Sequence, residues 1–283
     1  MSRPRFWLLS AVALQLGFVL ATHRLLPRGP EIVAMAHAAV VAGPLLWLAV
    51  LSVNDARDLA GDRLNPRKAD TPLVRGRITP RAAVRIGAVA SVAAVLAAVP
   101  LGAPFALGTA VAVLLGWAYS MPPLRLKARV GADVLVNSCA VGLLGPLGGW
   151  VAVTGTVAGF PWPMGVVGVL AVAGLYLPTT LVDHGADRRV GVRTTAVVLG
   201  RRATFELGFA LWTASAVVTF VLAAGDVVID RSLLPAHLVL TPMLLVLYRM
   251  VLRGRPSFPA VMAVAGAYLL PCAMFVATYV ESI

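Results

Sequence analysis

Charged side chains are scarce in this sequence, and acidic ones are the scarcest. Only 13% of the 283 residues are charged, with 12 Asp and Glu against 24 Lys and Arg, whereas 59% are hydrophobic. The mean hydropathy of +0.88 lies far above the values of soluble globular proteins. The composition therefore excludes a soluble protein, including one that binds nucleic acid through its excess of basic residues, and predicts an integral membrane protein.

Cysteine is almost absent as well. Cys139 and Cys272 both lie inside apolar runs, which predicts small buried side chains and no disulfide. No polar stretch is long enough to form a soluble domain with its own core. The apolar run at the N-terminus lacks a small-residue cleavage site, so we interpret it as a retained first span.

Apolar runs of about 20 residues, the length that a bilayer requires, occur nine times. They cover residues 6–25, 32–54, 82–101, 104–120, 133–153, 163–183, 204–224, 233–252 and 258–280. With the N-terminus inside, 21 of the 24 Lys and Arg residues fall on the cytoplasmic side. We therefore expect a multi-pass protein of the plasma membrane, with a cytoplasmic N-terminus and a C-terminus outside.

Two carboxylate stripes end apolar runs that are four helices apart. Asn54, Asp58 and Asp62 follow one another at i, i+4 and i+8, and Asp183 and Asp187 repeat the i, i+4 spacing, so each set shares one helix face. Like charges at this spacing repel one another, and carboxylates at the end of a membrane span are costly. Each stripe therefore predicts a cationic partner on the cytoplasmic side.

Two interpretations of the stripes remain open. Carboxylate and amide oxygens without neighbouring Cys or His clusters suit Mg²⁺, which usually binds through a few carboxylates together with substrate phosphates. The alternative is solvated acids paired with Arg57, Arg63 and Arg188. The matching placement of the two stripes favours a magnesium and diphosphate site. It also predicts one domain, residues 1–283, made of two parallel halves, roughly 1–130 and 131–283.

The loop after the fourth run contains Tyr119-Ser120-Met121-Pro122-Pro123-Leu124-Arg125-Leu126-Lys127. The two prolines favour a fixed, non-helical loop. Basic groups near acids that hold Mg²⁺ would complete the neutralisation of a diphosphate. The candidate diphosphate ligands are Lys68, Tyr119, Ser120, Arg125 and Lys127; the alternative for each basic residue is the general excess of positive charge on the cytoplasmic side.

Three motifs together resemble the UbiA superfamily of intramembrane prenyltransferases: N-D-x-x-D-x-x-x-D at Asn54 to Asp62, Y-S-x-P-P-x-R-x-K at Tyr119 to Lys127, and D-x-x-x-D-x-x-x-G-x-x-T at Asp183 to Thr194. The resemblance implies an all-α, nine-span bundle with a central cavity open to the cytoplasm. It also implies Mg²⁺ and prenyl diphosphate binding by the acidic motifs, which carries over to Asn54, Asp55, Asp58, Asp62, Asp183 and Asp187. Lys68, Tyr119, Arg125 and Lys127 carry over as basic and tyrosine ligands.

The second acidic motif departs from many relatives, which have an acidic residue and a glycine just before the last Asp, where this chain has Gly185 and Ala186. The departure bears on the acceptor and not on the diphosphate. His184 lies between the two acids, and we interpret it as a surface histidine at a helix end rather than a proton acceptor. The proline-containing loop most resembles that of the chlorophyll synthase and archaeal ether-lipid branch.

These features predict a Mg²⁺-dependent prenyltransferase of isoprenoid biosynthesis that moves a prenyl chain from a diphosphate to a lipophilic or aromatic acceptor. The expected catalytic residues are Asp58, Asp62, Asp183, Asp187 and Tyr119. An intramembrane terpene cyclase would use the same stripes without an acceptor, and a transporter or lipid-binding protein could use paired acids for cation coupling. The identity of the acceptor, the prenyl chain length, the proton-accepting base and the oligomeric state do not follow from the sequence.

Overall fold

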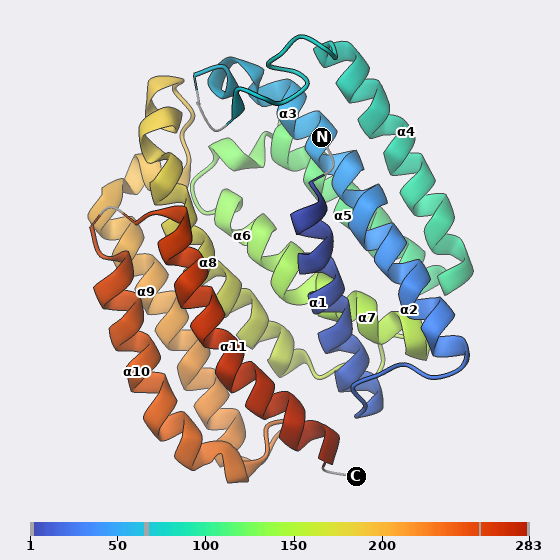
Figure 1. Ribbon diagram of the computed structural model, residues 1–283, viewed down its shortest axis with the longest axis vertical. Helices are drawn as coiled ribbons and strands as arrows, with labels where there is room; N and C mark the ends of the chain where they lie inside the picture. Colours follow the sequence, from blue (N-terminus) through green and yellow to red (C-terminus); the bar gives the residue numbers. More distant parts are fainter. Residues whose placement is uncertain (1–2, 65–67, 255, 282–283) are drawn as a thin grey trace.

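The computed structural model describes residues 3–64, 68–254 and 256–281, and within these ranges the regular structure is entirely helical (Figure 1). The α-helices are α1 (Pro4–Thr22), α2 (Pro30–Val40), α3 (Leu46–Asp62), α4 (Pro80–Ala98), α5 (Ala103–Ser120), α6 (Ala132–Cys139), α7 (Gly145–Thr154), α8 (Trp162–Arg189), α9 (Thr195–Ala224), α10 (Leu234–Leu252) and α11 (Phe258–Glu281). Short 3₁₀ turns cover Val99–Leu101, Leu126–Ala128 and Arg231–Leu233.

The predicted spans agree with these helices. Among the described residues, eight helical segments are long and apolar enough to cross a membrane, and a shorter apolar helix, Phe6–Thr22, precedes them. Two spans are built from two α-helices each, joined by π-helical turns at Val41–Leu45 and Ala140–Leu144. The first π turn contains Pro44, which lacks an N–H donor, and the wider turn accommodates the missing hydrogen bond.

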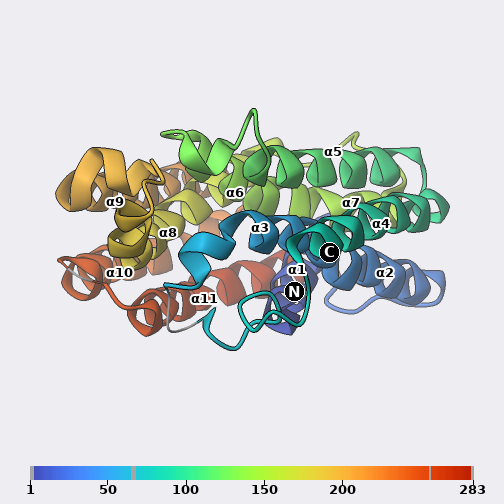
Figure 2. The same ribbon diagram turned by 90° about the horizontal axis from the view of Figure 1, so that it is seen from above.

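The helices form one bundle whose outer flanks are α2–α5 on one side and α8–α10 on the other, with α1 and α6 between them (Figures 1 and 2). Small residues allow the closest helix contacts. A Cβ atom placed on Gly17 of α1 would lie 1.8 Å from the Pro146 carbonyl oxygen of α7, and one on Gly149 would lie 1.8 Å from the Leu14 oxygen. Such contacts are typical of helices that pack in lipid, where close backbone approach supplies the dispersion energy.

The two described ends of the chain lie at opposite ends of the bundle (Figure 1). The ends of α3 and α5, the end of α8 and the start of α9 meet near the end of the bundle where α1 begins. This arrangement brings three separate polar segments of the sequence to one membrane face.

Candidate functional site

The first carboxylate stripe lies on the last two turns of α3 and contacts a lysine from a distant loop. Lys127 Nζ donates to Asn54 Oδ1 at 3.0 Å and to Asp58 Oδ1 at 2.5 Å. Ser120 Oγ, at the end of α5, donates to the same Asn54 oxygen at 3.1 Å. The helical face predicted from the i, i+4 spacing is thus held against the loop that follows α5.

Lys127 is unusually enclosed for a lysine. It lies in the 3₁₀ turn Leu126–Ala128, outside the spans, and is only 6% exposed. Burial lowers the pKa of its ammonium group below the ordinary value, and the Asp58 carboxylate opposes that shift. A buried ammonium beside carboxylates is a point charge suited to neutralising a phosphate group that enters the same space.

The remaining carboxylates of the first motif also pair with basic residues. Lys68 Nζ lies 3.0 Å from Asp62 Oδ1. Arg3 Nη2 lies 2.7 Å from Asp55 Oδ1, and Asp55 is only 4% exposed. The alternative interpretation of the stripes predicted ion pairs with Arg57, Arg63 and Arg188. In the structure, Asp55 pairs with Arg3, Asp58 with Lys127 and Asp62 with Lys68.

The second stripe, at the end of α8, comes close to the first. Asp187 interacts electrostatically with Asp183, with Asp58 of α3 and with Lys127, and it lies against the Thr194 hydroxyl. A Cβ atom on Gly61 would contact Val190 Cγ2 at 3.5 Å, so the ends of α3 and α8 touch. The two stripes therefore end near one another, and Lys127 is close enough to both to interact with Asp58 and with Asp187.

The acids alone do not make a complete metal cage. In the part of the chain that the structure describes, no group of three or more His, Cys, Asp and Glu side chains is close enough together to hold a metal ion. Mg²⁺ usually binds through one or two carboxylates and completes its shell with phosphate oxygens and water. The oxygen donors Asn54, Asp58, Asp62, Asp183 and Asp187 fit a site of that kind.

Arg125 and Tyr119 are two further candidate ligands, one in the loop after α5 and one near the end of α5. Arg125 adopts a left-handed conformation with φ 40°, and its Nε is buried without a hydrogen-bond partner among the described residues. A buried N–H donor without an acceptor is costly, so this nitrogen is available to hydrogen-bond an anionic ligand. Tyr119 OH and Tyr176 OH share a hydrogen bond of 2.9 Å, which holds the Tyr119 ring against α8.

Comparison with known proteins decides the family. The sequence pattern of the UbiA prenyltransferase family matches residues 8–267. The chain belongs to this family. It is an intramembrane prenyltransferase, so the predicted all-helical membrane fold and the predicted activity are confirmed, while the central cavity open to the cytoplasm stays a prediction.

Individual relatives agree with this assignment. The lycopene elongase/hydratase of Haloferax volcanii is 35% identical over 233 residues, covering 77% of this chain and 69% of that protein. The 4-hydroxybenzoate octaprenyltransferase of Burkholderia vietnamiensis is 30% identical over 175 residues, covering 62% and 57%. The structure of a UbiA homolog from Archaeoglobus fulgidus bound to GPP and Mg²⁺ shares the fold, with a TM-score of 0.75, 20% identity, and coverage of 99% and 96%.

Two further polar residues near the site, Tyr176 and Asp133, were not predicted from the sequence. Tyr176 precedes Asp183 by seven residues, two helical turns, and this spacing on one face is the signal that could have found it. Asp133 is 0% exposed and accepts hydrogen bonds from the backbone N–H groups of Val134, at 3.0 Å, and Thr195, at 2.9 Å. A lone acid at the start of the fifth apolar run was the signal for Asp133, because a carboxylate at the end of a membrane span needs a partner.

Proposed function

We propose that the space between the ends of α3 and α8 binds an allylic prenyl diphosphate together with Mg²⁺. The single observation that carries this proposal is Lys127, whose buried ammonium contacts Asn54 and Asp58 and interacts electrostatically with Asp187 of the other stripe. A phosphate group in the same space would give this cation a second acceptor and would bring metal ions to the facing acids.

Each group then has a role that follows from its chemistry. Asn54, Asp58, Asp62, Asp183 and Asp187 would hold Mg²⁺, and the bound metal supplies Lewis-acid neutralisation of the diphosphate. Lys68, Ser120, Arg125 and Lys127 donate hydrogen bonds to diphosphate oxygens, and the unpartnered Nε of Arg125 gains its acceptor. Asp55 instead positions Arg3, since it is buried in contact with that guanidinium.

Tyr119 and Tyr176 would stabilise the prenyl group of the substrate. When the bond between the allylic carbon and the diphosphate oxygen breaks, positive charge spreads over the allyl group. The rings of Tyr119 and Tyr176, fixed by their shared hydrogen bond, offer π faces that stabilise a cation by about 0.5–2 kcal/mol. The surrounding apolar helices exclude water from that carbon.

We further propose that the acceptor is the end of an acyclic polyene of the lycopene type. The support is the 35% identity with a lycopene elongase/hydratase over 77% of this chain. The π electrons of a terminal double bond of the acceptor form the new carbon–carbon bond while diphosphate leaves. The resulting tertiary cation is discharged by loss of a proton or by capture of water followed by loss of a proton.

We also propose a plasma-membrane location with the site facing the cytoplasm, supported by the excess of Lys and Arg on that face. The activity is tested with purified protein in nanodiscs, given dimethylallyl or geranyl diphosphate with lycopene, with 4-hydroxybenzoate, or with no acceptor, each with and without EDTA. Elongated lycopene and released diphosphate, both abolished by EDTA and restored by Mg²⁺, are expected. Prenylated 4-hydroxybenzoate with unaltered lycopene would reject the polyene acceptor and leave the diphosphate site intact.

A further inference from the structure

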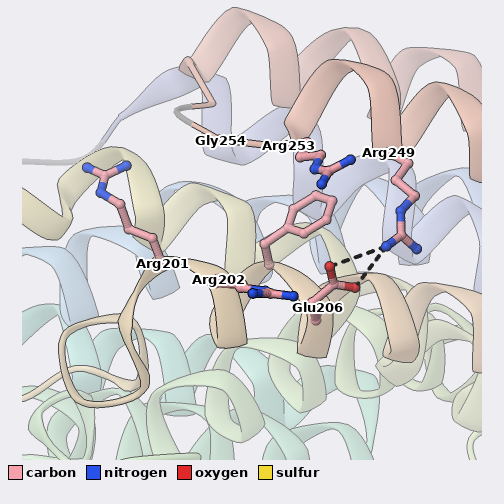
Figure 3. A pocket seen from close by; sticks show the side chains of 7 residues that line it. Arg201, Arg202, Glu206, Arg249, Arg253 and Gly254 are labelled. Carbon is pink, nitrogen blue, oxygen red and sulfur yellow. Dashed lines mark hydrogen bonds and ion pairs between the residues drawn. The ribbon is translucent and has the colours of Figure 1, made fainter.

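A polar cavity that is lined by none of the carboxylates of the two stripes lies between α9 and α10 (Figure 3). Its volume is about 590 Å³, and it is lined by Arg201, Arg202, Phe205, Glu206, Arg249, Arg253 and Gly254. We call it the arginine cavity. None of the proposed diphosphate or metal ligands lines it, and α9 and α10 lie on the outer flank of the bundle (Figure 1).

The lining of the arginine cavity carries four guanidinium groups and one carboxylate, a net charge of +3. Glu206 forms an ion pair with Arg249, whose Nη2 lies 3.3 and 3.4 Å from the two carboxylate oxygens. The Arg249 guanidinium also stacks over the Phe209 ring at 4.7 Å, so it is held in place. In Figure 3, Arg202 and Arg253 lie beside this pair. One carboxylate does not balance four cations, and the excess favours an anionic ligand.

The start of a helix adds to the positive charge of the arginine cavity. Gly200 has φ 78° and ψ 168°, which breaks α9, so its long segment begins at Arg201. The first turn of a helix carries a positive partial charge, which disfavours cations there and favours anions. Arg201 and Arg202 occupy that unfavourable position. An anion between α9 and α10 would offset both the guanidinium groups and the helix dipole.

A mostly apolar groove lies between the same two helices, further from the end of the bundle that holds the arginine cavity. A cavity of about 200 Å³ is lined by residues that include Ala216, Val217 and Phe220 of α9 with Pro242 and Leu245 of α10. From Glu206 to Ala216 is about 15 Å along a helix, which is about half the hydrocarbon thickness of a bilayer. Val217, at 56% exposed, borders the groove on the lipid side. The charged cavity and the groove match a headgroup and a single chain.

We propose that the arginine cavity and the groove, together called the α9–α10 seam, bind one anionic phospholipid of the surrounding bilayer. Its phosphate lies among Arg202, Arg249 and Arg253, and one acyl chain lies in the groove beside Ala216. Basic pockets between membrane helices bind acidic headgroups in this way, with about 1 kcal/mol from each Lys or Arg near the surface. The lipid is a bound component of the protein and not a substrate, and it occupies the leaflet on the side of the carboxylate stripes.

The test is native mass spectrometry of the intact protein released from nanodiscs that contain equal amounts of phosphatidylglycerol and phosphatidylcholine. The wild type should retain one phosphatidylglycerol in preference to phosphatidylcholine. The double variant Arg202→Gln/Arg253→Gln should lower that retention about tenfold or more, since two charges are removed. Its prenyltransferase activity should persist, which shows that it folds.

A matched control separates the cavity from general surface charge. Arg81 and Arg85 are exposed on α4, at the same end of the bundle as Arg202 and Arg253 and outside the arginine cavity. Arg81→Gln/Arg85→Gln removes the same charge and should leave lipid retention unchanged. Equal loss in both double variants would mean that only the membrane surface potential acts, and would overturn the proposal.

Two further measurements distinguish a lipid from a free anion and from the prenyl substrate. Ala216→Phe fills the groove and should reduce phosphatidylglycerol retention while all four guanidinium groups remain. Inorganic phosphate at millimolar concentration should leave the bound lipid in place. Displacement of the lipid by phosphate or by geranyl diphosphate, or unchanged retention in Ala216→Phe, would reject an acyl lipid as the occupant of this seam.

Discussion

Thr195 donates its backbone N–H, at 2.9 Å, and also its hydroxyl to the carboxylate of Asp133, and both residues are almost completely buried. Thr195 begins α9 directly after the second acidic motif. Asp133 lies in the first turn of α6, just after the loop that carries Arg125 and Lys127. The pair thus joins two of the three polar segments of the candidate site.

This contact predicts a positioning role for Asp133. Asp133→Asn replaces one acceptor oxygen by a donor and leaves a Thr195 donor without an acceptor, which costs about 1–3 kcal/mol. We expect a lower melting temperature and a raised KM for prenyl diphosphate, because the loop with Lys127 loses its anchor. Thr195→Val keeps the backbone hydrogen bond but removes the hydroxyl that donates to Asp133 and accepts from Gly131 N–H, so it should also cost about 1–3 kcal/mol.

Thermal unfolding and steady-state kinetics in detergent measure both effects. Asp230→Asn is the matched control, because Asp230 is an exposed acid that accepts only a local hydrogen bond from Ser232 N at 2.7 Å. An unchanged KM in Asp133→Asn, with only stability reduced, would show that the buried pair supports the fold without positioning the loop.

Diphosphate release should depend on both acidic stripes. Asp58→Asn and Asp187→Asn are each expected to lower turnover about 100-fold or more, because each removes charge that stabilises the leaving diphosphate and its metal. Asp70→Asn serves as the control, since Asp70 is exposed and pairs with Arg75 on the same face. Near-normal turnover in either stripe variant, with Mg²⁺ still required, would show that the metal does not depend on that carboxylate.

The aromatic pair gives a prediction about the organic half of the reaction. Tyr119→Phe keeps the ring and should retain most turnover, whereas Tyr119→Ala should lose about tenfold or more, through the missing cation–π contact. Tyr176→Phe breaks the same hydrogen bond from the other side and is the comparison variant. Product analysis with and without acceptor gives the readout. A cyclic hydrocarbon or alcohol, formed equally fast with no acceptor, would contradict prenyl transfer.

Membrane orientation is open to direct labelling. In a Cys139→Ser/Cys272→Ser background, single cysteines at Arg77 and Arg189 should resist an impermeant maleimide in intact cells, and one at Val157 should react. All three positions are exposed, so accessibility to the reagent depends on the side of the membrane. Reaction at Arg77 and Arg189 from outside would reverse the topology and place the proposed site on the outer face.

The sequence was sufficient for features that repeat or that follow a helical period. Hydrophobic runs predicted the spans, and the i, i+4 spacing predicted the face of α3 that Lys127 contacts. Contacts between distant segments left no local pattern: the pairing of Arg3 with Asp55, and of Asp133 with Thr195, depends on how the helices pack. The predicted seventh span began at residue 204, whereas α9 begins at Thr195 and breaks at Gly200, so the helical turn before that glycine was missed. The division into halves 1–130 and 131–283 stays a prediction.

The close crossing of α1 and α7 also sets the order in which the chain can assemble during synthesis. Gly17 and Pro146, which meet at that crossing, are separated by more than a hundred residues of sequence. Later still, His23 at the end of α1 stacks on Tyr279 of α11 with ring centroids 4.1 Å apart. Because α1 is synthesised before both partners, its contact with α7 and its stacking against α11 can form only after those later helices have been made.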